Sequence, residues 1–335
     1  MKSDIKHVFM AIAIGICLVG CKRTVSYRMC EGNIWHTACH ITYQSTNDMK
    51  DSIMSILNGV ELSLSTFNNA STISKINKSP GPMKCDALIA EVFKESQRIN
   101  RLSNGAFDPT VGPLVDLWGF GHDRDSIRNV SQNTIDSLMS RIGLQECHID
   151  EYGFLIKKHP ETEFNFSAIA KGYACDKISE MFRRNHIENY LIEIGGEIVM
   201  RGHNPKHDIW RIAIDAPFFI SDNGEYQTAG TIAVSDCAVA SSGNYRNYKE
   251  HEGKIIAHSI NPISGKPIQN ETLAVTVIAP KCMTADALAT ACMVMPLESA
   301  RTMIENLPEI AALFIVTDNN HISTIKTVNF PEVTK

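Results

Sequence analysis

Residues 104–121, NGAFDPTVGPLVDLWGFG, constrain this chain most, because they combine residue types that rarely occur together. The glycines permit backbone angles that other residues avoid, and the two prolines fix the chain and remove amide donors. One carboxylate of this segment, Asp108, stands among large apolar side chains. We expect either a buried loop that fills the core or a loop that wraps a flat apolar ligand. Composition alone favours the buried loop.

Five further segments follow in order: SAIAKGYACD at 167–176, IGGE at 194–197, SSGNYRNY at 241–248, HSINPISGKP at 258–267 and ADALATA at 285–291. Together with the first segment they resemble the motifs of the ApbE-type FAD:protein FMN transferases. The resemblance extends from about residue 32 to about residue 296. Six ordered matches are far more specific than any one short motif.

The fold class follows from the order of the expected elements. Strands and helices mix without regular alternation, and no G-x-G-x-x-G follows a strand, which argues against a doubly wound nucleotide-binding fold. We expect an α+β fold. It would be a single ApbE-like catalytic domain over residues 32–330, with mixed, largely antiparallel sheets and packed helices.

Apolar spacing predicts amphipathic helices over residues 48–64 and 86–102. Ser131 is a plausible N-cap for another helix, and Thr284 is expected to cap a helix over residues 285–295. The remaining expectations are a strand over 34–43, hairpins over 189–201, 147–157 and 310–326, and a Ser241-Ser242-Gly243 turn around a phosphate.

The N-terminal residues 1–20 have the features of a secretory signal, with Lys2 and Lys6 before a short apolar run. The run is too short to span a bilayer comfortably. It ends in LVGC, which resembles a bacterial lipobox. We therefore expect acylation of Cys21, a tether over residues 21–31, and an exported bacterial lipoprotein that is membrane-anchored and faces the periplasm. The alternative is a plain signal peptide with a chance cysteine.

The formal net charge of −5 and the pI near 6.2 give no basic surface of the kind that binds nucleic acid, so no nucleic acid partner is expected. Export favours disulfides, but none of the ten cysteines forms a C-x-x-C pair. No disulfide is assigned from the sequence.

The resemblance implies a set of residues that contact the flavin nucleotide: Trp35, Phe67, Ala106, Phe107, Asp108, Asn165, Lys171, His258 and Ile260. Trp35 and His36 replace the usual Met and Gly of the family, although an indole can still stack on a flavin ring. Asn165 stands where the family usually has Asp, and it keeps a hydrogen-bonding oxygen without the charge. Phe67 is an equally good core residue on sequence grounds.

The resemblance also implies a Mg²⁺ site formed by Asp286, Thr290 and the backbone carbonyl of Ala168. Asp286 and Thr290 are four residues apart, so they share one face of a helix. A carboxylate and a hydroxyl suit a hard cation that keeps several waters. The alternative for Asp286 is a favourable contact with the helix dipole. Lys171 at a helix start conflicts mildly with that dipole, which suggests an anionic partner such as pyrophosphate.

The implied reaction is Mg²⁺-dependent transfer of FMN from FAD to a Thr or Ser hydroxyl of an acceptor protein, with release of AMP. His258 would act as the general base and Asp286 would hold the metal. The acceptor would be a membrane redox-complex subunit or an exported flavoprotein. The alternatives are a metal-dependent FAD pyrophosphatase, a non-catalytic FAD-binding lipoprotein, and an anchored binding protein for another ligand.

Overall fold

The computed structural model describes residues 25–121, 130–220, 226–244, 248–251, 254–257, 259–318 and 321–334. The predicted signal segment, Cys21 and His258 lie outside the described residues. None of the helices within the described residues is long and apolar enough to cross a membrane.

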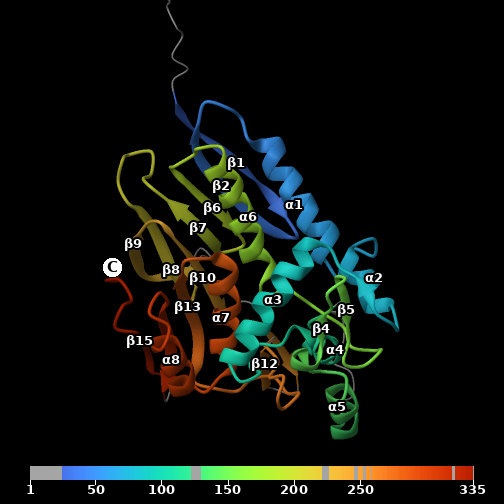
Figure 1. Ribbon diagram of the computed structural model, residues 1–335. Coiled ribbons are helices and arrows are strands. Elements are labelled where there is room, and N and C mark those ends of the chain that lie inside the picture. The colour runs from blue at the N-terminus through green and yellow to red at the C-terminus, as the bar shows by residue number, and fades with distance from the viewer. Residues whose placement is uncertain are drawn as a thin grey trace, which may run out of the picture.

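The fold is organised by one eight-stranded sheet in which every neighbouring pair of strands is antiparallel (Figure 1). In spatial order the strands are β1 (Ser26–Ile34), β2 (Thr37–Ser45), β6 (Tyr190–Ile194), β7 (Glu197–Arg201), β10 (Cys237–Gly243), β13 (Thr272–Ala279), β14 (Ala311–Asp318) and β15 (His321–Lys326). The prediction of an α+β fold with largely antiparallel sheets is confirmed.

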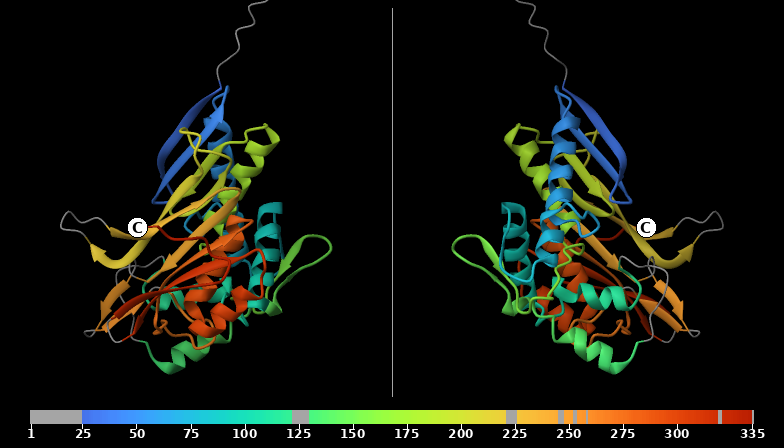
Figure 2. Two further views of the ribbon diagram at one scale, coloured as in Figure 1. Left: turned by 90° about the vertical axis from the view of Figure 1, so that its left-hand side faces the viewer. Right: turned by 90° about the vertical axis from the view of Figure 1, so that its right-hand side faces the viewer.

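Both faces of this sheet are covered, so the molecule has three layers (Figure 2). On one face lie α6 (Ala170–Arg184) and α7 (Cys282–Val294), against which α1 (Lys50–Leu64) and α3 (Ala87–Leu102) pack. On the opposite face lies the hairpin of β8 (Trp210–Ile220) and β9 (Tyr226–Val234).

The two cores explain why the central strands are nearly continuous apolar runs. In β14, Ala312 and Phe314 belong to the core beneath the helices, while Leu313 and Ile315 belong to the core beneath the β8–β9 hairpin. Successive side chains of a strand point to opposite faces, so a strand that is buried on both faces needs apolar residues at every position. The β14 strand meets this requirement.

Smaller elements complete the fold (Figure 1). They are α2 (Thr72–Lys78), β3 (Met83–Lys84), η1 (Pro109–Val111), α4 (Gly112–Leu117), α5 (Gln132–Met139), η2 (Leu144–Glu146), β4 (His148–Ile149), β5 (Phe154–Ile156), β11 (Tyr248–His251), β12 (Lys254–Ala257) and α8 (Leu297–Glu305). The predicted Ser131 cap is confirmed, because its hydroxyl accepts a hydrogen bond from the Thr134 N–H at 3.2 Å.

The expected strand over residues 34–43 is confirmed from Thr37 onward and wrong at its start, because the chain turns back at Trp35 and His36. β1 and β2 form a hairpin whose two-residue turn is Trp35-His36, with φ angles of 50° and 62°. Such turns usually carry Asn and Gly, so their sequence signal is absent here. Residues 26–31 of the expected tether belong instead to β1, which pairs with β2.

The predicted start of α7 is wrong as well. The helix begins at Cys282, and the Thr284 hydroxyl donates to Glu95 at 2.6 Å instead of capping it. The cap comes from α6, where the Asp176 carboxylate accepts hydrogen bonds from the N–H groups of Cys282 and Met283 at 2.8 and 2.9 Å. Because this cap comes from a distant part of the chain, no local motif predicts it.

The close approach of α6 and α7 depends on Gly172. A Cβ atom at this position would overlap the Cys282 carbonyl and lie 2.9 Å from the Cβ of Asp286. We predict that Gly172→Ala lowers the free energy of unfolding by about 1–3 kcal/mol, because the two helices must move apart. Urea unfolding measures this loss.

Gly59→Ala in α1 is the matched control, since nothing lies within 4 Å of the added Cβ. That variant is expected to gain about 0.5–1 kcal/mol from helix propensity alone. Equal effects of the two substitutions would contradict the role given to the α6–α7 contact.

Candidate active site

Residues 104–121 form compact structure and not an extended loop. After a turn at Gly105 they continue into η1 and α4, whose residues Leu114 and Leu117 are buried in a small core with Ile135 and Ile260. The Trp118 indole N–H donates to the Gly265 carbonyl at 2.9 Å. This segment therefore holds residues 259–267 in place through both packing and a hydrogen bond.

The same segment also contacts the start of the 167–176 motif. The backbone N–H of Asn165 donates to the Pro109 carbonyl at 2.7 Å, and the side-chain oxygen of Asn165 accepts from the Ser167 N–H and hydroxyl at 3.0 and 2.6 Å. An Asp at this position could accept the same two bonds, so the substitution by Asn preserves the turn.

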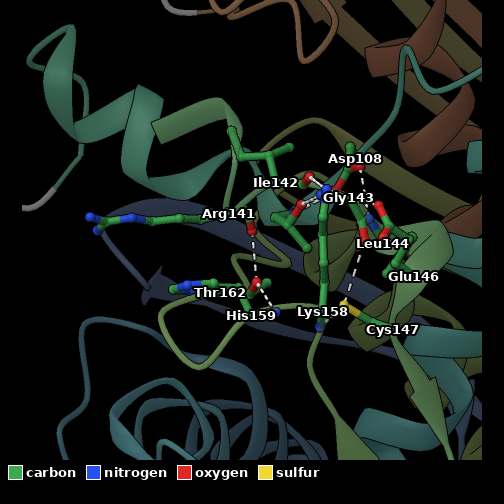
Figure 3. Close-up of polar contacts among 11 residues, drawn as sticks. Asp108, Arg141, Ile142, Gly143, Leu144, Glu146, Cys147, Lys158, His159 and Thr162 are labelled. Atoms are coloured by element: carbon green, nitrogen blue, oxygen red, sulfur yellow. Dashed lines mark hydrogen bonds and ion pairs between the residues drawn. The ribbon is translucent and has the colours of Figure 1, made fainter. Parts of the chain in front are cut away.

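Asp108 is 9% exposed, and internal donors surround its carboxylate (Figure 3). One oxygen accepts from the N–H and the hydroxyl of Thr110 at 2.8 and 2.6 Å, and the other accepts from the Leu144 N–H at 3.0 Å. Burial raises the pKa of Asp108, although these three donors oppose the shift. Both oxygens thus fix the segment, and a nucleotide contact by Asp108 stays a prediction.

The support around Asp108 extends to Gly143, whose N–H donates to the Thr110 hydroxyl at 2.9 Å. In Figure 3 the long side chain of Lys158 runs alongside this turn. Its ammonium donates to the Ile142 carbonyl at 3.0 Å and pairs with Glu146 at 2.8 Å. The turn that carries Leu144 is therefore fixed on both sides.

The centre of the candidate site lies where α6 begins beside the second turn of α7. The Asp286 carboxylate accepts the Gly172 N–H at 3.1 Å, and Asp286 is only 3% exposed. The ammonium of the preceding residue, Lys171, lies 3.3 Å from an oxygen of Glu197, whose side chain is 6% exposed. When both carboxyl groups are ionised, two carboxylates and one ammonium give this cluster one negative charge.

The electrostatics of the cluster favour cations. Burial opposes the charge on Lys171, but the carboxylates of Glu197 and Asp286 outweigh it and raise the pKa of the lysine. Burial also raises the pKa of both carboxyl groups, which shows that their negative charge is costly without further positive charge nearby.

The three predicted metal ligands come from α7 and from the chain just before α6, and their role as ligands stays a prediction. Thr290 lies one turn beyond Asp286 on α7, and its hydroxyl is 3.4 Å from the Ser242 hydroxyl. Ala168 stands four residues before Gly172 and just before α6 begins. Within the described part of the chain, no group of three or more His, Cys, Asp or Glu residues could hold a metal ion. The predicted donors are one carboxylate, one hydroxyl and one carbonyl.

This donor set fits Mg²⁺, a hard cation that usually takes one or two carboxylates and keeps waters and phosphate oxygens as its other ligands. A further observation supports the fit, because the second oxygen of Glu197 is buried without a hydrogen-bond partner. Within the described residues the second oxygen of Asp286 has no hydrogen-bond partner either. A negatively charged centre with incompletely bonded carboxylates is what a cation stabilises.

The residues expected to contact the flavin fall into two groups. Ala106, Phe107 and Ile260 are at most 4% exposed, so their side chains belong to the core. Trp35 is half-buried beside the 194–197 turn, where the Gly195 N–H donates to the Ala38 carbonyl at 2.9 Å. Phe67 is 59% exposed, which makes its alternative as a core residue wrong.

The expected phosphate-binding turn at Ser241-Ser242-Gly243 is wrong, because these residues belong to β10. They pair with β13 in regular antiparallel register, and the Ser241 hydroxyl is 2.9 Å from the Thr276 hydroxyl. They are therefore part of a strand and not of a turn that could close around a phosphate. Only the Ser242 hydroxyl reaches the centre, through Thr290.

Sequence reasoning missed Glu197 and Asp176 as residues of the site and its support. Glu197 follows two glycines with φ angles of 65° and 98°, which close the tight β6–β7 hairpin and aim the next side chain inward. The IGGE motif contained this signal, since a Gly-Gly turn fixes which residue opens the following strand.

Comparison with known proteins agrees with this arrangement. The profile of the ApbE family matches residues 35–314. The chain belongs to the ApbE family. A Vibrio cholerae protein named FAD:protein FMN transferase is 35% identical over 319 residues, covering 93% of this chain and 94% of that protein. A Haemophilus influenzae protein of the same name is 32% identical over 327 residues, covering 94% of each.

Solved structures of ApbE proteins have the same fold. The flavin transferase ApbE from Vibrio cholerae has a TM-score of 0.81 at 32% identity, covering 91% of this chain and 98% of that one. The apo form of the Pseudomonas stutzeri flavinyl transferase ApbE also has a TM-score of 0.81, at 29% identity, covering 91% and 95%.

The buried hydrogen bonds of Asp108 lead to a prediction. Asp108→Asn replaces one acceptor oxygen by an NH₂ group that faces a donor, so the free energy of unfolding should fall by about 1–3 kcal/mol. Urea unfolding tests this, with the exposed Glu151→Gln as the control. FAD affinity, followed by flavin fluorescence, should weaken in the same variant. Lost FAD binding at unchanged stability would instead show a direct ligand contact.

Proposed function

We propose that this chain is an exported flavin transferase that moves FMN from FAD to a Thr or Ser hydroxyl of an acceptor protein and releases AMP. The observation that carries the proposal is the buried, negatively charged oxygen cluster of Asp286 and Glu197 beside Lys171. It lies where motifs from distant parts of the chain meet. The names of the ApbE relatives support the same activity.

Each residue has a distinct part in this proposal. Asp286, Thr290 and the Ala168 carbonyl hold Mg²⁺, which when bound offsets the charge of the phosphoryl oxygens. Lys171 supplies a fixed positive charge to the diphosphate of FAD. The 104–121 segment holds residues 259–267 through Gly265 and Ile260. In this proposal His258 would accept the proton of the acceptor hydroxyl.

The transfer forms one bond to phosphorus and breaks another. The acceptor hydroxyl oxygen forms a bond to the FMN phosphorus, and the bond from that phosphorus to the bridging oxygen breaks. The hydroxyl proton passes to His258. AMP leaves with the bridging oxygen, and FMN remains as a phosphoester of the acceptor side chain.

We also propose that the chain is a lipoprotein with acylated Cys21, held on a membrane and facing the periplasm. The supports are the basic and apolar pattern of residues 1–20 and the LVGC sequence at its end. Acyl chains would anchor the protein by burial of their methylene groups. The acceptor would then be a membrane redox-complex subunit or an exported flavoprotein.

The transfer reaction is tested with FAD, Mg²⁺ and an acceptor protein that one of the related transferases modifies. We expect mass spectrometry to show covalent FMN on a Thr or Ser of the acceptor, together with AMP in equal amount. Asp286→Ala should lose this activity at least about a hundredfold, because a metal-bound phosphate is worth several kcal/mol. Free FMN with an unmodified acceptor would show a pyrophosphatase and contradict the transfer.

Removal of divalent cations tests the metal separately. AMP release from FAD should stop in EDTA and recover on addition of Mg²⁺, because the phosphate charge then regains its partner. Chromatography of AMP gives the rate. Release that continues undiminished in EDTA would contradict the metal site assigned to Asp286 and Thr290.

A further inference from the structure

Glu197 is a buried carboxylate that the proposed reaction does not use. It opens β7 directly after the Gly195-Gly196 turn, and it is 4% exposed. Its backbone carbonyl accepts from the Cys175 thiol at 3.3 Å, which fixes the residue against α6. A charged side chain in this position is costly unless a specific partner compensates it.

That partner is Lys171. One Glu197 oxygen lies 3.3 Å from the Lys171 ammonium, while in the described part of the chain no ion pair joins Lys171 to Asp286. The lysine nevertheless belongs to the same centre, because the next residue, Gly172, donates its N–H to Asp286. Two buried carboxylates are therefore possible partners for the Lys171 ammonium, and the one with which it forms an ion pair is Glu197.

Which carboxylate pairs with Lys171 affects the binding of any cation at Asp286. An ammonium paired with Asp286 would occupy the carboxylate oxygen that is left without a hydrogen bond, and it would compete with a divalent ion for it. Held by Glu197 instead, Lys171 leaves that oxygen free. Its side chain remains 30% exposed, so Lys171 lies at the edge of the buried cluster.

We propose that Glu197 is a positioning residue that holds Lys171 away from Asp286, so that Asp286 is free for the divalent cation and Lys171 faces the diphosphate. This inference rests on the proposed function for the identity of the anion. The cation part concerns only the three side chains and is tested without FAD.

The test is a double-mutant cycle on metal binding, with Mn²⁺ alone as the probe and the EPR signal of free Mn²⁺ as the readout. Glu197→Gln keeps the shape of the side chain and removes its charge, so Lys171 should turn to Asp286. We expect Mn²⁺ binding to weaken about ten- to hundredfold, the size of effect that changes around the ligands have on metal affinity, because the ammonium then competes for Asp286. Glu193→Gln, on the neighbouring strand β6, is the matched control and should bind Mn²⁺ like the unaltered protein.

The second half of the cycle separates positioning from simple structural support. Adding Lys171→Met to Glu197→Gln removes the competing ammonium, so Mn²⁺ affinity should return to within about threefold of the original value. A structural defect would not be repaired by a second buried substitution. Thermal unfolding of all the variants checks that they are folded.

Three results would overturn the inference: unchanged Mn²⁺ affinity in Glu197→Gln, no recovery in the double variant, or no Mn²⁺ binding by the unaltered protein. Failure of the proposed function is seen elsewhere, as absent AMP release from FAD by the unaltered protein. A protein that binds Mn²⁺ and follows the cycle but releases no AMP would keep the role of Glu197 and lose the transferase.

Discussion

The contact between the first turn of α6 and the second turn of α7 is the interaction on which the site depends. Gly172 has no side chain, so the two helices approach closely enough for its N–H to reach Asp286. Asp176, one turn further along α6, caps the start of α7 and fixes the helices in register. Two hydrogen-bonded carboxylates thus lock the two helices together beside the central sheet.

The contact between α6 and α7 brings two carboxylates close together, although like charges repel. Asp286 and Glu197 are both buried, and they come from a helix and a strand that are far apart in the chain. Lys171 offsets one of the two negative charges. The second negative charge is not compensated within the cluster, so a bound cation would stabilise it. The contact between the two helices limits how far the side chains can move apart.

Much of this architecture could be predicted from the sequence, and the reasons are local. Long amphipathic patterns gave α1 and α3, and the Gly-Gly turn gave the β6–β7 hairpin. The start of α7 could not be predicted, because its cap comes from Asp176, 106 residues earlier in the chain. The turn at Trp35 was missed because neither of its residues is a turn former.

For the site, too, the local features could be predicted from the sequence and the long-range contacts could not. Ordered motifs indicated the fold and the residues around Asp286, since spacing on a helix fixes which side chains share a face. The motifs could not show that both carboxylate oxygens of Asp108 accept hydrogen bonds from within the protein, or that Phe107 and Ile260 are buried. Burial and long-range hydrogen bonds are properties of the folded chain, and a motif identifies a position without its surroundings.

The Trp35-His36 turn has a consequence for how this hairpin can vary. Two neighbouring non-glycine residues in the left-handed region cost about 1–3 kcal/mol each, and an Asn-Gly pair would relieve most of that strain. Thermostability engineering by consensus turns would therefore select against the indole at this corner. An Asn-Gly turn would therefore stabilise the hairpin, and it would remove the half-buried indole from this corner.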